Sequence, residues 1–166
     1  MTDIIYLKGD ATNPLFDGTK IIAHICNDTG GWGKGFVLAI SKRWKEPDNK
    51  YRQWYRDKLL LSADIAIPFE LGRTQFVMVQ NEPVIYIANM IAQHGIGKKN
   101  NIPPIRYEAL SECLQYVCTQ AKITNASVHL PRIGCGLAGG KWEIIEPIIK
   151  KELLTHDIPV YVYDFE

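Results

Sequence analysis

The order of apolar and polar residues alternates between two patterns along the chain. Short, nearly continuous apolar runs are typical of strands inside a sheet, and apolar residues every three or four positions are typical of helices with one buried face. The first pattern predicts strands at 4–8, 21–26, 63–70, 75–80, 84–90, 127–130 and 159–164. The second predicts helices at 36–44, 48–60, 106–122 and 142–154.

This alternation predicts an α/β fold with a mostly parallel central sheet between helical layers. The three strands in the middle of the chain are joined by the short turns 71–74 and 81–83. Short turns connect antiparallel strands, so we expect a mixed sheet in a three-layer α/β/α architecture. Ligands of such sheets bind beyond the carboxyl ends of the strands, where the glycine-rich segments of this chain are predicted to lie.

Length and composition narrow the class of protein. The 166 residues are 46% hydrophobic and 22% charged, with a formal net charge of +1, and predict one globular domain over 1–166. With a net charge this close to zero, the protein has no strong electrostatic attraction to a membrane surface or to long nucleic acid. No signal peptide or apolar run of about 20 residues stands out, so we expect a cytoplasmic protein without a membrane segment.

The cysteines and histidines give no metal signature. Four cysteines are scattered without a C-x-x-C pair, which is typical of reduced thiols. The four histidines show no ligand spacing relative to them, so we expect no metal and no cofactor.

Two glycine-rich loops follow buried strands and precede helices. The segment 134–140 follows the strand at 127–130, and the segment 30–35 follows the strand at 21–26. Glycines let a backbone approach a phosphate closely, and the free N–H groups of a helix N-terminus favour an anion. The two loops therefore indicate either a shared site for a nucleotide diphosphate or two structural turns.

Two standard motifs fit these loops poorly. The residues 134–139 read G-x-G-x-x-G, as in a Rossmann dinucleotide site, but the acid Asp164 lies further past the glycines than the usual ~20 residues. The loop at 30–35 lacks the spacing of a P-loop. We therefore interpret neither loop as a Rossmann dinucleotide site or a P-loop.

Some side chains have two open interpretations at this stage. Asp10, just past a strand, either caps the next turn or accepts hydrogen bonds from a ligand. His24, inside an apolar run, is typical of a core histidine as well as of a catalytic one. Aromatic and basic residues alternate over 48–60, which suits nucleic-acid binding but suits a helix with an aromatic core face better.

Three separated motifs resemble those of the macrodomain family. The first, H-x-C-N-x-x-G-G-W-G-x-G, spans His24 to Gly35; the second, P-R-I-G-x-G-L-x-G, spans Pro131 to Gly139; the third is G-D-A-T at 9–12. The resemblance covers nearly the whole chain. It is nearest to the branch that contains the yeast-type ADP-ribose-1″-phosphate phosphatase and the terminal ADP-ribose–protein glycohydrolase, with G-G-W-G favouring the phosphatase side.

The resemblance implies ADP-ribose or a derivative as the ligand. By analogy, Asp10 accepts from the adenine amino group, the second loop binds the diphosphate, and Asn27 contacts the distal ribose, while Tyr163 or Phe165 packs on adenine. The ligand-binding residues so implied are Gly9, Asp10, Ala11, Asn27, Gly31, Trp32, Gly33, Lys34, Gly35, Arg132, Ile133, Gly134, Cys135, Gly136, Leu137, Ala138, Tyr163 and Phe165.

The resemblance also implies chemistry at the distal ribose. His24, with Asn27 and Trp32 beside it, is the catalytic candidate for hydrolysis of ADP-ribose-1″-phosphate or of an ADP-ribosyl ester. The related glycohydrolases use a lysine nucleophile and an acid, but the acid's position is Ala138 here. Lys98 and Lys99 lie in the region of that lysine, although exposed loop residues are the simpler interpretation.

Two classes of function therefore remain open: a hydrolase, which we favour, and a non-catalytic ADP-ribose reader. The expected partner is ADP-ribose, free or attached to a protein or nucleic acid.

Overall fold

The computed structural model describes residues 3–59 and 67–165. Its strands are β1 (Ile5–Lys8), β2 (Lys20–Asn27), β3 (Thr74–Asn81), β4 (Val84–Gln93), β5 (Ser127–Leu130) and β6 (Val160–Asp164). Its helices are α1 (Phe36–Arg43), α2 (Glu46–Leu59), α3 (Tyr107–Thr124) and α4 (Trp142–Glu152), with a single 3-10 turn at Leu154–His156.

The six strands form one mixed sheet in the order β1-β6-β5-β2-β4-β3. Every neighbouring pair is parallel except β3 and β4, which are antiparallel, as the short turn between them predicts. The predicted mixed, mostly parallel sheet is confirmed. The carboxyl ends of β2, β4 and β5 consequently meet at one edge, and the loops that follow them lie together.

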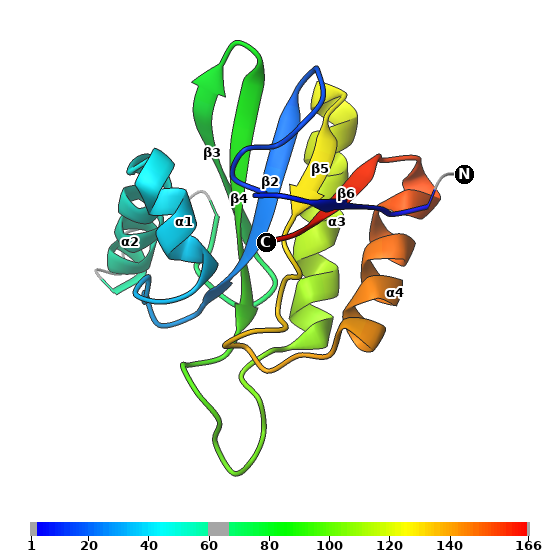
Figure 1. Ribbon diagram of the computed structural model, residues 1–166. Coiled ribbons are helices and arrows are strands. Elements are labelled where there is room, and N and C mark those ends of the chain that lie inside the picture. The colour runs from blue at the N-terminus through cyan, green and yellow to red at the C-terminus, as the bar shows by residue number, and fades with distance from the viewer. Residues whose placement is uncertain (1–2, 60–66, 166) are drawn as a thin grey trace.

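Helices cover the sheet in two layers. Figure 1 shows α3 and α4 on one side and α1 and α2 on the other. The side chains of β2 alternate between these layers: Ile21 and Ala23 belong to the core under α3 and α4, whereas Ile22 and Cys26 belong to the core under α1 and α2. A strand buried on both faces explains the continuous apolar run in the sequence.

The strand predicted at 63–70 is wrong over its described part, 67–70. Of the range 63–70, residues 63–66 lie outside the described residues, and 67–70 are irregular. Phe69 is buried against the rings of Tyr51 and Trp54, and the Trp54 indole N–H donates to the Ile67 carbonyl at 2.6 Å. Phe69 packs under α2 without pairing to a strand, so its hydrophobicity does not signal sheet pairing.

The helix predicted at 48–60 begins two residues earlier, at Glu46, and residue 60 is outside the described range. Its buried face carries Tyr51 and Trp54, which confirms the core interpretation of these aromatic residues. Among the described residues no helix has the length and apolar character needed to cross a membrane.

Candidate functional site

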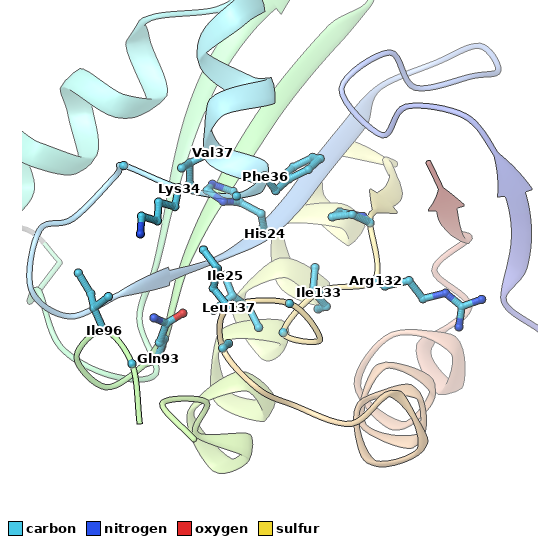
Figure 2. A pocket seen from close by; sticks show the side chains of 17 residues that line it. His24, Ile25, Lys34, Phe36, Val37, Gln93, Ile96, Arg132, Ile133 and Leu137 are labelled. Carbon is cyan, nitrogen blue, oxygen red and sulfur yellow. The ribbon is translucent and has the colours of Figure 1, made fainter. Parts of the chain in front are cut away.

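A cavity of about 780 Å³ opens at the carboxyl ends of β2, β4 and β5 (Figure 2). Two segments form its main walls: the first loop, Thr29–Gly35, and the second loop, Pro131–Lys141. Its volume lies in the range usual for small-molecule sites. It is lined by His24, Ile25, Gly33, Lys34, Gly35, Phe36, Val37, Gln93, Ile96, Gly97, Pro131, Arg132, Ile133, Gly134, Gly136, Leu137 and Ala138.

The first loop is organised by the amide of Asn27. Its Oδ1 accepts the backbone N–H groups of Thr29 and Gly31, each at 3.0 Å, and the Tyr51 hydroxyl at 2.9 Å. Its Nδ2 donates to the Gly31 carbonyl at 2.9 Å. Asn27 does not line the cavity. The amide therefore shapes the loop from behind, although the sequence predicts it as a ligand contact.

Trp32 anchors the same loop in the core. Its side chain is only 4% exposed, its indole N–H donates to the Ser41 hydroxyl at 2.8 Å, and its ring meets His24 edge-on with the centroids 5.3 Å apart. Like Asn27, Trp32 does not line the cavity. Of the three predicted catalytic residues, His24 alone faces it.

The second loop folds back on itself within a few residues. The Gly140 N–H donates to the Gly134 carbonyl at 2.6 Å, and the Gly139 N–H donates to the Gly136 carbonyl at 3.0 Å. Gly134 has φ +75°, and a Cβ there would lie 2.6 Å from Ile105 Cδ1. The glycine at 134 is therefore required by both backbone conformation and packing.

The two loops present unused backbone donors to the cavity. Within the described part of the chain, no hydrogen bond uses the N–H groups of Gly136, Leu137 and Ala138. The same holds for the N–H groups of Lys34 and Gly35, directly before α1. Because α1 begins at Phe36, its positive dipole end also faces the cavity. This arrangement suits an anion.

His24 lies in the wall of the cavity and is 2% exposed. Its Nε2 lies 2.6 Å from Asn89 Oδ1, and Asn89 Nδ2 donates to Gln75 Oε1 at 3.0 Å. This network assigns the proton to Nε2 and leaves Nδ1 as an acceptor. Burial lowers the pKa of His24 from 6.5 to about 4, although the hydrogen bond to Asn89 opposes this shift. The imidazole is therefore neutral at pH 7.

The charged side chains of the cavity wall are both basic. Lys34 and Arg132 line it, whereas no carboxylate appears among the described lining residues. Lys98 and Lys99 are exposed and lie outside the lining. In the part of the chain that the structure describes, no three His, Cys, Asp or Glu side chains gather as metal ligands would.

The predicted adenine-binding residues lie beyond the cavity wall. Asp10 Oδ1 accepts the N–H and the hydroxyl of Thr12 at 2.8 and 2.7 Å, so Asp10 organises its own turn. The Tyr163 side chain is 2% exposed, and its hydroxyl accepts the Leu15 N–H at 2.9 Å. Phe165 is 80% exposed. Of the two predicted aromatic residues, Phe165 is thus the accessible one.

The predicted ligand-binding residues divide into those that line the cavity and those that do not. The cavity wall includes Gly33, Lys34, Gly35, Arg132, Ile133, Gly134, Gly136, Leu137 and Ala138. It does not include Gly9, Asp10, Ala11, Asn27, Gly31, Trp32, Cys135, Tyr163 or Phe165. The predicted site also lacks seven residues of the cavity wall, namely Ile25, Phe36, Val37, Gln93, Ile96, Gly97 and Pro131. Gln93 ends β4, and Ile96 and Gly97 follow it; the available signal was a strand end followed by glycines.

Comparison with known proteins identifies the class. No protein-family model matches the chain. A solved macrodomain protein from Streptomyces coelicolor is 51% identical, with a TM-score of 0.83, and the match covers 98% of this chain and 99% of that one. The chain belongs to the macrodomain family. A protein of unknown function from Bacteroides thetaiotaomicron is 56% identical, with a TM-score of 0.90 and 98% of both chains covered.

Curated relatives are more distant. Chromodomain-helicase-DNA-binding protein 1-like from Mus musculus is 33% identical over 99% of this chain, but the chain spans only 18% of that protein's length. An ADP-ribose 1″-phosphate phosphatase from Candida albicans is 24% identical, with 89% of this chain and 92% of that protein covered.

Proposed function

We propose that this protein binds ADP-ribose, with the diphosphate held between the first and second loops. The observation that carries the proposal is the set of unused N–H groups on residues of both loops that line one cavity. Backbone donors beside a helix N-terminus bind phosphate without a metal or a dedicated cation. The Candida albicans relative is an ADP-ribose 1″-phosphate phosphatase, and this similarity supports the same ligand.

Calorimetric titration of the intact protein tests this proposal. We expect ADP-ribose to bind, and adenosine to bind at least about tenfold more weakly, because adenosine lacks the diphosphate that the loops would hold. The apolar wall that includes Ile25, Phe36 and Ile133 remains available to both compounds. Absence of binding at about millimolar ADP-ribose would refute the proposal.

A second candidate function is hydrolysis of ADP-ribose-1″-phosphate, and the observation in its favour is the neutral imidazole of His24 in the cavity wall. In this reaction, water attacks phosphorus while Nδ1 takes its proton, and the bond between phosphorus and the ribose oxygen breaks. The imidazolium, with a pKa of about 4, then gives the proton to the leaving ribose oxygen. An ADP-ribosyl ester is the second substrate that this arrangement suits.

Replacement of His24 tests this chemistry. We expect His24→Asn to retain ADP-ribose binding and to release phosphate about 100-fold more slowly, since general base catalysis typically contributes at least that factor. Phosphate release and binding are measured on the same preparation. If phosphate and ester substrates are both untouched by the wild type while ADP-ribose binds, the protein is a reader. If the variant is equally active, His24 takes no part.

A further inference from the structure

Arg132 lies at the start of the second loop, and two of its guanidinium nitrogens contact one carboxylate. Nε lies 2.8 Å from Asp164 Oδ1, and Nη2 lies 3.0 Å from Asp164 Oδ2. Such a two-point contact fixes the plane of the guanidinium and neutralises its charge. Asp164 ends β6, so the pair ties the second loop to a strand of the sheet.

Two aromatic rings contact the same guanidinium. Its Cζ lies 4.8 Å from the ring centroid of Tyr6 and 5.0 Å from that of Trp142. The Trp142 indole N–H donates to the Tyr6 hydroxyl at 3.1 Å, and that hydroxyl donates to Glu146. Cation–π contacts of this kind favour a fixed position of the arginine. The cluster of Tyr6, Arg132, Trp142, Glu146 and Asp164 is called the arginine clamp below.

The arginine clamp joins the second loop to three separate elements. Tyr6 lies on β1, Asp164 on β6, and Trp142 and Glu146 on α4. Figure 2 shows the Arg132 side chain directed away from Lys34 and Ile96 on the other side of the cavity. The guanidinium therefore belongs to the outer side of the loop, although Arg132 also contributes to the cavity wall.

We propose that Arg132 is a positioning residue, which holds the second loop in its donor-presenting shape, and that its guanidinium does not bind the phosphates of the ligand. This inference rests on the proposed binding of ADP-ribose. Under this proposal, Lys34 supplies the positively charged side chain near the phosphates. The second loop binds the phosphates through its backbone N–H groups.

The variant Asp164→Asn separates the two roles by the sign of its effect. If Arg132 positions the loop, removal of its carboxylate partner loosens the clamp, and ADP-ribose affinity falls about fivefold. If the guanidinium binds phosphate, the same change frees a cation beside the ligand, and affinity rises. A rise in affinity overturns the proposal.

Arg132→Lys gives a second, independent result. Lysine keeps the charge but cannot make the two-point, stacked contact, so we expect about tenfold weaker binding. A matched control is Arg73→Lys: Arg73 pairs with Glu70 and lies over the Tyr116 ring, outside the cavity wall. We expect that control to leave affinity unchanged. Full retention of affinity in Arg132→Lys contradicts the proposal.

Hydrogen exchange of the ligand-free protein tests the arginine clamp independently of whether ADP-ribose binds. We expect the hydrogen-bonded amides of the second loop, those of residues 133, 135, 139 and 140, to exchange about tenfold faster in Asp164→Asn and Arg132→Lys than in the wild type, at a temperature well below unfolding. If ADP-ribose does not bind the wild type, the proposed function fails, and the clamp is still judged by exchange. Unchanged exchange in both variants overturns the clamp.

Discussion

Lowering the pH from 7 to about 4.5 is expected to reduce the free energy of unfolding by about 5 kcal/mol, because two buried histidines resist protonation. Burial lowers the pKa of His24 to about 4, and burial with the nearby Lys20 charge lowers that of His129 to about 3. Both start from 6.5 in the unfolded chain. As the pH falls below 6.5 the unfolded state takes up two protons that the folded state refuses, so stability is lost.

The size of this effect follows from the pKa values. Each histidine contributes about 2.5 kcal/mol at pH 4.5, and the loss ends once the pH is below the folded pKa. Carboxylates such as Asp164 contribute in a lower window: hydrogen bonding to Arg132 lowers the pKa of Asp164 from 3.8. The stabilisation from Asp164 is present above 3.8 and is lost only as the pH falls further, so the loss between pH 7 and 4.5 comes mainly from the two histidines.

Urea unfolding at the two pH values checks this prediction. His129 lies 2.8 Å from both the Ser127 and the Tyr163 hydroxyls, so His129→Gln keeps a polar side chain there. We expect this variant to lose about half as much stability as the wild type between pH 7 and 4.5. The exposed control His156→Gln should behave like the wild type. An equal loss in His129→Gln and wild type would contradict the assignment.

Gly140→Ala is expected to weaken ADP-ribose binding about 100-fold, or about 3 kcal/mol. A Cβ at 140 would lie 2.6 Å from the Gly134 carbonyl oxygen, which is the acceptor that closes the second loop. That contact is with backbone, so no side-chain rotation relieves it. The loop must open, which moves the unused N–H groups of Gly136 to Ala138 away from their positions in the cavity wall.

Gly136→Ala is the matched comparison. A Cβ at this position meets nothing within 4 Å, and the backbone N–H is retained. We therefore expect a loss of at most about threefold in Gly136→Ala. Calorimetry on both variants, with thermal unfolding to establish that each is folded, measures the difference. Similar affinities in the two variants would show that the closed loop is not needed.

The sequence predicted the elements whose local pattern agrees with their environment. Strand 127–130, the second loop and the helix from Trp142 were all recognisable, because a buried strand, a glycine turn and an amphipathic helix each have a local signature. The segment 67–70 was not, because Phe69 packs under α2 without joining the sheet and Ile67 is exposed. A hydrophobic side chain can pack in the core although its backbone does not pair with a strand.

The site was less predictable than the fold. Asn27 and Trp32 stand within a ligand motif, yet their side chains turn toward Tyr51 and Ser41 in helices that follow later in the chain. Side-chain direction of this kind depends on tertiary packing, which no spacing encodes. The loop after β4 was missed for a related reason, since the sequence does not state that β4 pairs with β2.

The strand order has a consequence for how the protein is made. Ile5 of β1 pairs with Tyr161 of β6, and β5 enters the sheet between β6 and β2. During synthesis, β1 and the first loop emerge long before their partners, and these distant pairings form late and at a high entropic cost. The cavity exists only after β5 and the second loop have docked. Ligand binding by a nascent chain would therefore report the docking of β5 and the second loop beside β2.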